Sequence, residues 1–352
     1  MFKSFFRMIS PKKKLSKRYS MFAENKIIKQ NNLPFKLEEN IINGSFGKIY
    51  RGVFNDESCC IKKINLIQYR EIENKVANKI TEHYNSFIKN KLTPNPLNQS
   101  PINQSPLNQS PINQSPLNQK ITSNTKQTER PRSRPKSSSK PIGIKYLCRT
   151  LGKFRIENNI YLIMPYYPNK DMFFHIEENY LKQHRKMNVK QALKYTLKMA
   201  EAIDALNTLG YAHLDVKLEN FVLDDNNNPI LIDYGSCQLF PMEDTLFPLK
   251  YDCGTKCYIP PEVFMNFYGN KSDVWSLGVC LYSMLTNSSL YEDIDDYFAS
   301  EQYKSLHVNN FYIADVPEFI NELIGDMLQR SPAKRISIKN VIVELKSLIY
   351  ML

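Results

Sequence analysis

The sequence has no apolar run of about 18–20 residues, the length that a helix needs to cross a bilayer. Its seven cysteines form no Cys-x-x-Cys pair and no cluster with histidine. This pattern excludes a disulfide scaffold and a zinc site, and it predicts reduced thiols in a cytoplasmic protein. Phe2 stands where N-myristoylation needs glycine, and charges interrupt the first apolar residues too often for a secretory signal.

The basic surplus of the chain is confined to two segments. The net charge is +12, and residues 1–35 and 91–145 each carry +8, so the rest of the chain sums to about −4. A DNA-binding domain needs a basic surface on its folded part, and we therefore expect no nucleic-acid partner. Residues 1–34 are predicted to form a basic disordered tail. The tail could also lie on an anionic membrane surface or act as a nuclear import signal.

A low-complexity segment, residues 91–143, interrupts the sequence. From Pro96 onward the unit Pro-Leu/Ile-Asn-Gln-Ser repeats five times, and a basic stretch follows at 130–140. Proline at every fifth position forbids a continuous helix, and one apolar residue per repeat cannot build a core. We expect a disordered insert within a single domain that spans residues 35–352.

The flanking segments change character along the chain. Short β-type runs and a glycine turn predict a hairpin and a third strand over 35–63, with further strands at 147–154 and 160–167. A helix is expected at 67–87, and apolar spacing of three or four predicts helices at 189–206, 272–285, 316–329 and 337–350. The expected fold class is α+β, with a small β-rich lobe before a larger helical lobe.

The most specific motif is His213-Leu214-Asp215-Val216-Lys217-Leu218-Glu219-Asn220, followed by Asp233-Tyr234-Gly235. It combines a carboxylate, an ammonium, a carboxamide and a second carboxylate, the groups that phosphoryl transfer from ATP requires. The motif resembles the H-R-D-x-x-x-x-N and D-F-G signatures of eukaryotic protein kinases. That resemblance implies that Asp215 accepts the substrate hydroxyl proton and Lys217 neutralises the γ-phosphoryl group. Asn220 and Asp233 would hold Mg²⁺.

The β-rich half carries the rest of an ATP site by the same resemblance. Asn43-Gly44-Ser45-Phe46-Gly47-Lys48-Ile49 is similar to the glycine-rich loop, with Ile42 in place of its first glycine, and Gly44, Gly47 and Ile49 would face the nucleotide. Lys62, in Cys60-Ile61-Lys62, would hold the α- and β-phosphates. Its acidic partner is expected to be Glu71, with Glu73 as the alternative, although the gap from Lys62 is shorter than is usual in the family.

The segment Tyr161–Phe173 resembles the fifth strand and the hinge between kinase lobes. Met164 would be the gatekeeper beside the adenine, and the backbone N–H groups of Tyr166 and Tyr167 would meet the purine edge. Asp171 would contact the ribose or a substrate arginine, or else cap the following helix.

The sequence resembles serine/threonine kinases at two positions. Lys217 follows Asp215 by two residues in the catalytic loop, and Thr255 precedes Pro260-Pro261-Glu262 in the activation segment. The resemblance also implies that Glu262 pairs with Arg335 and that Asp273 caps the catalytic loop. The expected activity is transfer of the γ-phosphate of ATP to Ser/Thr hydroxyls of proteins, with basic sites read by Asp171 and Glu219. The alternative is a pseudokinase scaffold that binds nucleotide with little catalysis.

Leu214 occupies the position that holds arginine in most kinases that are switched by phosphate. Because leucine cannot bind phosphate, we expect an activation segment ordered by packing, without phosphorylation at Thr245 or elsewhere between Asp233 and Glu262. The Ile-Lys-Lys, His-Leu-Asp and Pro-Pro-Glu triplets are similar to the FIKK kinases of apicomplexan parasites, whereas Cys60 and Tyr234 depart from that pattern.

Overall fold

The computed structural model describes residues 33–44, 47–92, 142–241, 244–290 and 311–352. The expected basic tail, apart from its last two residues, and the pentapeptide repeats lie outside these ranges. Among the described residues, no helix is both long and apolar enough to cross a membrane.

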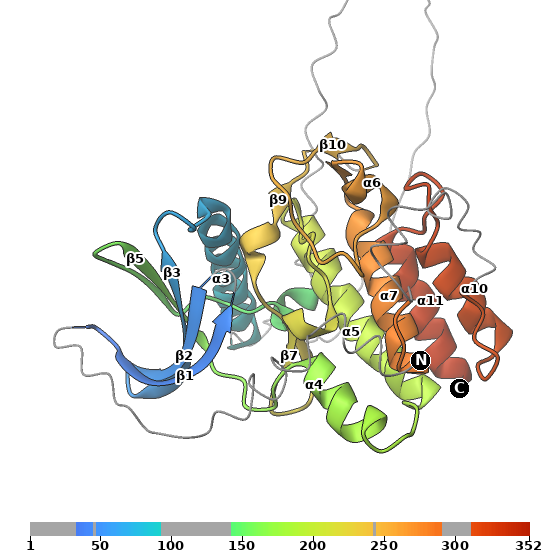
Figure 1. Cartoon of the computed structure of the whole chain (residues 1–352), viewed down its shortest axis with the longest axis horizontal. Coiled ribbons are helices and arrows are strands. Elements are labelled where there is room, and N and C mark those ends of the chain that lie inside the picture. Colours follow the sequence, from blue (N-terminus) through green and yellow to red (C-terminus); the bar gives the residue numbers. More distant parts are fainter. Residues whose placement is uncertain (1–32, 45–46, 93–141, 242–243, 291–310) are drawn as a thin grey trace, which may run out of the picture.

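The small lobe is a five-stranded antiparallel sheet in the order β1-β2-β3-β5-β4 (Figure 1). One side of the sheet buries Leu37, Tyr50, Ile61 and Ile163 in an apolar cluster. A second small cluster contains Ile64, Ile160 and Leu162, with Tyr69 packed against it. The strands are β1 (Lys36–Gly44), β2 (Gly47–Phe54), β3 (Glu57–Asn65), β4 (Gly152–Ile156) and β5 (Asn159–Pro165).

Helix α3 (Glu71–Leu92) follows β3 and begins four residues later than the sequence pattern predicts. A tight turn uses the intervening residues, because the backbone N–H groups of Gln68 and Tyr69 both donate to the Asn65 carbonyl oxygen. The buried apolar residues of α3 are Val76, Ala77 and Ile80, which belong to the same apolar cluster as Ile144. Helix α3 is thereby part of the main core.

The strand predicted at 147–154 begins only at Gly152. The preceding residues pair with the large lobe instead, since Leu147 forms a parallel bridge with Leu231 and the Cys148 N–H donates to the Leu231 carbonyl oxygen at 2.9 Å. A sequence pattern cannot tell which partner an apolar run will pair with. Residues 147–148 therefore connect the small lobe, through β4, to the large lobe.

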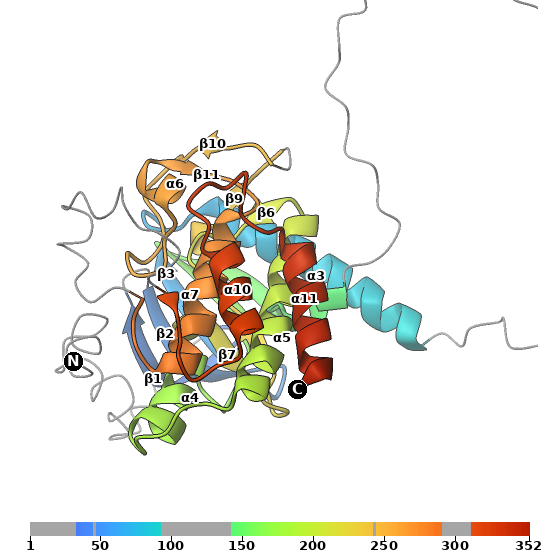
Figure 2. The ribbon, with the colours of Figure 1, turned by 90° about the vertical axis from the view of Figure 1, so that its right-hand side faces the viewer.

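The large lobe is helical, and α5 packs against both α7 and α11. Figure 2 shows α10 and α11 beside α5 and α7 on the face away from the sheet. Trp275 of α7 is fully buried in this core. The helices are α4 (Met172–Ile176), α5 (Val189–Thr208), α6 (Pro261–Phe264), α7 (Ser272–Thr286), α10 (Glu318–Met327) and α11 (Ile338–Met351).

Short antiparallel strand pairs lie in the loops of the large lobe. They are β6 (Tyr211–Ala212) with β9 (Gln238–Leu239), β7 (Phe221–Leu223) with β8 (Pro229–Leu231), and β10 (Phe247–Pro248) with β11 (Phe267–Tyr268). The α+β, two-lobed fold predicted from the sequence is confirmed.

A buried ion pair locks α6 onto the end of the large lobe. Arg335 donates from Nη1 to Glu262 Oε1 at 2.6 Å and from Nη2 to Oε2 at 2.9 Å, and both side chains are almost fully buried.

Glu262→Ala should lower the free energy of unfolding by about 3–5 kcal/mol, because it leaves the Arg335 charge buried without its partner. Asp315→Ala removes the exposed pair with Lys186 and is the matched control. Urea unfolding measures both, and equal losses would contradict the assignment.

The ends of the expected insert overlap folded elements. Leu92 ends α3, and a 3₁₀ turn begins at Ile142. A side chain at Gly143 would clash with the backbone of Glu201 on α5, so this residue has to stay.

Replacing residues 93–141 with a Gly/Ser linker of about ten residues should preserve soluble, folded protein, because loop closure costs only about 0.6 kcal/mol per doubling of length. Circular dichroism and thermal melting check this, and insoluble protein would show that the segment belongs to the core.

Candidate active site

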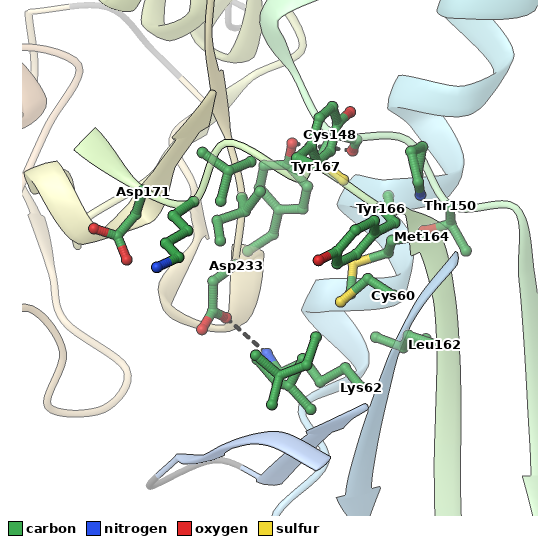
Figure 3. Close-up of a pocket in the computed structure, with 18 of the residues that line it drawn as sticks. Cys60, Lys62, Cys148, Thr150, Leu162, Met164, Tyr166, Tyr167, Asp171 and Asp233 are labelled. Atoms are coloured by element: carbon green, nitrogen blue, oxygen red, sulfur yellow. Dashed lines mark hydrogen bonds and ion pairs between the residues drawn. The ribbon is translucent and has the colours of Figure 1, made fainter. Parts of the chain in front are cut away.

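A cavity of about 260 Å³ lies between the sheet and the large lobe. One wall comes from β2, β3 and β5, and the opposite wall includes Asp171, Val222 and Ile232. Figure 3 shows Lys62 and Asp233 facing each other across this space. Ile49, Met164, Tyr166 and Tyr167 line the cavity, as do Asp171 and Glu219.

The Lys62 ammonium joins the two lobes. It donates to Glu73 Oε1 at 2.7 Å and to Asp233 Oδ1 at 2.8 Å, and the Lys62 side chain is only 6% exposed. Burial alone would lower the pKa of Lys62, but the two carboxylates outweigh it and raise this pKa above its ordinary value. Burial would likewise raise the pKa of Asp233, and the charge of Lys62 instead holds it below the usual value.

Glu73, and not Glu71, is the partner of Lys62, so the choice of Glu71 is wrong. Glu71 is 73% exposed and lies near Lys75, one helical turn away. The two glutamates are two residues apart, which turns them about 200° from each other around the helix. The sequence held a signal, because Glu73 lies three and four residues before Val76 and Ala77 on the buried face of α3.

Asp233 is aimed at Lys62 by the residue that follows it. Asp233 has a left-handed backbone (φ 63°), and its carboxylate accepts the Gly235 N–H at 3.3 Å. Tyr234 is buried, and its hydroxyl lies 2.9 Å from the Leu231 carbonyl oxygen and 3.1 Å from that of Cys148. The tyrosine ring packs edge-on against His213. The phenol is thus anchored to the large lobe, which fixes the turn.

The Asp215 carboxylate is surrounded by three donors. Thr255 Oγ1 donates to Oδ1 at 2.7 Å, while Lys217 Nζ and Asn220 Nδ2 lie 3.1 and 3.0 Å from Oδ2. Lys217 also donates to Thr255 Oγ1 at 2.7 Å. Residues that the sequence places forty positions apart therefore form one network. A carboxylate oxygen has two lone pairs, so Oδ1 can still accept a second hydrogen bond.

Asp273 of α7 holds the loop that carries Asp215. Its two oxygens accept the backbone N–H groups of His213 and Leu214 at 2.7 and 2.8 Å, and Asp273 is fully buried. Leu214 has a positive φ of 63°, a strained conformation for leucine that these hydrogen bonds maintain.

The remaining predicted residues differ in how directly they face the cavity. Gly44 and Gly47 pair across the β1–β2 turn, and a side chain at Gly47 would meet the Lys63 carbonyl oxygen at 2.3 Å. Ser45 and Phe46 lie outside the described residues. Asp171 caps α4 by accepting the Phe174 N–H at 2.8 Å, which is the alternative role that the sequence left open.

Two cysteines of the cavity wall were not predicted. Cys60 on β3 and Cys148 line it, and burial raises the pKa of each to about 12, so both thiols are protonated at neutral pH. Cys60 stands two residues before Lys62, where the family motif V-A-I-K has alanine, and this departure was the available signal.

Asn220 and Asp233 fit a hard divalent cation. Their donors are a carboxamide oxygen and a carboxylate, which Mg²⁺ prefers, and Asn220 directs its amide nitrogen toward Asp215. Within the described ranges, no three His, Cys, Asp or Glu side chains form a cluster able to hold a metal. Two protein oxygens suit Mg²⁺ that takes its other ligands from nucleotide phosphates.

The chain is 27% identical to the maternal embryonic leucine zipper kinase of Xenopus tropicalis over 209 residues, 58% of this chain and 30% of that protein. It is 33% identical to the Aurora kinase of Debaryomyces hansenii over 201 residues, 55% of this chain and 46% of that protein. It is also 26% identical to the serine/threonine-protein kinase PKH1 of Saccharomyces cerevisiae, matching 27% of its length. The matches thus span less than half of each relative.

The family model described as "Protein kinase domain" matches residues 119–344, more than half of the chain. The match includes Asp215, Asn220 and Asp233, while Lys62 and Glu73 precede it and are placed by the structure. The narrower likeness to FIKK kinases stays a prediction. The chain belongs to the protein kinase family.

Proposed function

We propose that the chain is an ATP-dependent protein kinase that transfers the γ-phosphate to serine or threonine hydroxyls. The observation that carries the proposal is the hydrogen-bonded network around Asp215, together with the contact between Lys62 and Asp233 in the cavity. Thr255 supports a serine/threonine preference, because its hydroxyl bridges Asp215 and Lys217.

Each group has a separate task in this mechanism. The Lys62 ammonium orients the α- and β-phosphates, and Lys217 meets the charge of the γ-phosphoryl group. Asp215 orients the substrate hydroxyl and accepts its proton as the oxygen attacks phosphorus. Mg²⁺, held by Asn220 and Asp233, would supply charge neutralisation at the phosphates. Because Lys62, Asp215, Asn220 and Asp233 are all in place, the pseudokinase alternative is disfavoured.

The proposal includes a preference for basic substrates. Asp171 and Glu219 both line the cavity. Glu177 lies near Asp171, and its pKa is raised mainly by burial, with smaller contributions from the charges of Glu178 and Asp171. Glu219 also lies close to Tyr258 of the large lobe, and burial first and the carboxylate of Glu219 second raise the pKa of Tyr258 above its ordinary value. A degenerate peptide library with labelled ATP tests both parts, and selection of acidic or apolar peptides would reject the basic preference.

Asp215→Asn should lower turnover by about 10²–10⁴ while MgATP binding stays nearly unchanged, because the amide cannot accept the hydroxyl proton. Steady-state kinetics and calorimetric titration with MgATP measure the two effects. Wild-type turnover in this variant would remove Asp215 from the mechanism.

The two glutamates of α3 form a matched pair of tests. Glu73→Gln should lower kcat/KM for ATP by about 10–100-fold, because the buried Lys62 loses one of its two counter-charges. Glu71→Gln changes an exposed side chain and should leave kcat/KM within about twofold. If the two variants behave alike, Glu73 does not position Lys62.

A further inference from the structure

Arg70 stands directly before α3 and contacts two other parts of the active site. Its Nη1 donates to the Gly235 carbonyl oxygen at 3.1 Å, and its guanidinium lies 4.0 Å from the centre of the Tyr251 ring. Glu73, the partner of Lys62, is three residues further along the same turn. Arg70 therefore connects the start of α3 to the turn that follows Asp233 and to the activation segment.

Tyr251 is itself anchored. Its hydroxyl donates to the Cys237 carbonyl oxygen at 2.8 Å, and the ring is half-buried. Burial raises the pKa of Tyr251 to about 12, against the opposing charge of Arg70, so the phenol stays a neutral donor at physiological pH. The ring offers its face to the cation and its hydroxyl to the segment after Asp233. A stacked arginine of this kind gains from both the ring quadrupole and the apolar contact.

Leu214, at the position that holds arginine in most kinases switched by phosphate, is packed among apolar side chains. Leu214 is buried in a cluster with Phe240, Val263 and Tyr268, and Leu249 packs against this cluster. Leu214 cannot pair with a charge on the activation segment. Of the described contacts, the stack of Arg70 on Tyr251 is a cationic link between α3 and this segment.

We propose that Arg70 and Tyr251 are positioning residues that hold α3 in the orientation that brings Glu73 to Lys62, without a phosphate on the activation segment. The proposal rests on the proposed kinase function. The guanidinium fixes the first turn of α3 from one side, and the ammonium of Lys62 fixes it from the other. Loss of the stack frees α3 to rotate, and Glu73 then leaves Lys62.

The test uses the full chain with its activation segment shown by mass spectrometry to carry no phosphate. Arg70→Ala and Tyr251→Leu should each lower kcat/KM for ATP about tenfold, the loss of one partly buried cation–π contact. Tyr251→Phe keeps the ring and should fall between these variants and the wild type. Arg185→Lys alters another stacked arginine, over Tyr180, and neither residue lines the cavity; this variant is the control expected to keep wild-type activity.

A double-mutant cycle separates positioning from a general loss of stability. The variant with both Arg70→Ala and Tyr251→Leu should lose less than the product of the two single losses, because each single change already removes the contact that the two side chains share. Hydrogen exchange should become faster in residues 71–80 and stay unchanged in α7 and α11. Multiplicative losses, or unchanged exchange in residues 71–80, would overturn the proposal. A wild-type chain that neither binds MgATP nor transfers phosphate would instead reject the proposed function.

Discussion

One buried ammonium, that of Lys62, determines how the two lobes must meet. A buried cation is tolerated only when carboxylates surround it, and Lys62 takes one from α3 and one from the turn at Asp233. The pairing therefore requires α3 to pack against the sheet and the Asp233 side chain to point toward Lys62 on β3. Each of these requirements is met by a separate set of contacts. Arg70, at the start of α3, stacks on Tyr251, and Tyr234, the residue after Asp233, donates its hydroxyl to the Leu231 carbonyl oxygen.

The large lobe contributes rigidity to the same arrangement. Asp273 on α7 holds the backbone on which Asp215 lies, and the bidentate pair of Glu262 with Arg335 fixes the segment that brings Thr255 to Asp215. The charged side chains at these points are buried and fully paired with named partners, so their positions follow from the core around them. The chemistry is assembled at the boundary between the helical lobe and the sheet, where α3 supplies Glu73 as one of the two charge partners of Lys62.

The fold and most of the site could be predicted because their signals are local. The motif around Asp215 and the lysine of β3 have fixed spacings, and helical periodicity identifies α5 and α7 from the sequence. Contacts that depend on helix phase or on distant pairing were harder. The choice between Glu71 and Glu73 depended on where α3 begins, and the pairing of Cys148 with Leu231 joins segments far apart in the chain. The stack of Arg70 on Tyr251 has no sequence pattern, because it exists only once both lobes have folded.

The account requires that packing, and not phosphate, holds the activation segment beside Asp215. Single-turnover transfer from MgATP by the phosphatase-treated protein is the most direct measurement of this claim. Treated and untreated protein should transfer phosphate at nearly the same rate, because Leu214 lies in an apolar cluster and carries no charge that could hold a phosphate. A rate about tenfold lower after treatment, restored when the segment between Asp233 and Glu262 is phosphorylated again, would contradict the account.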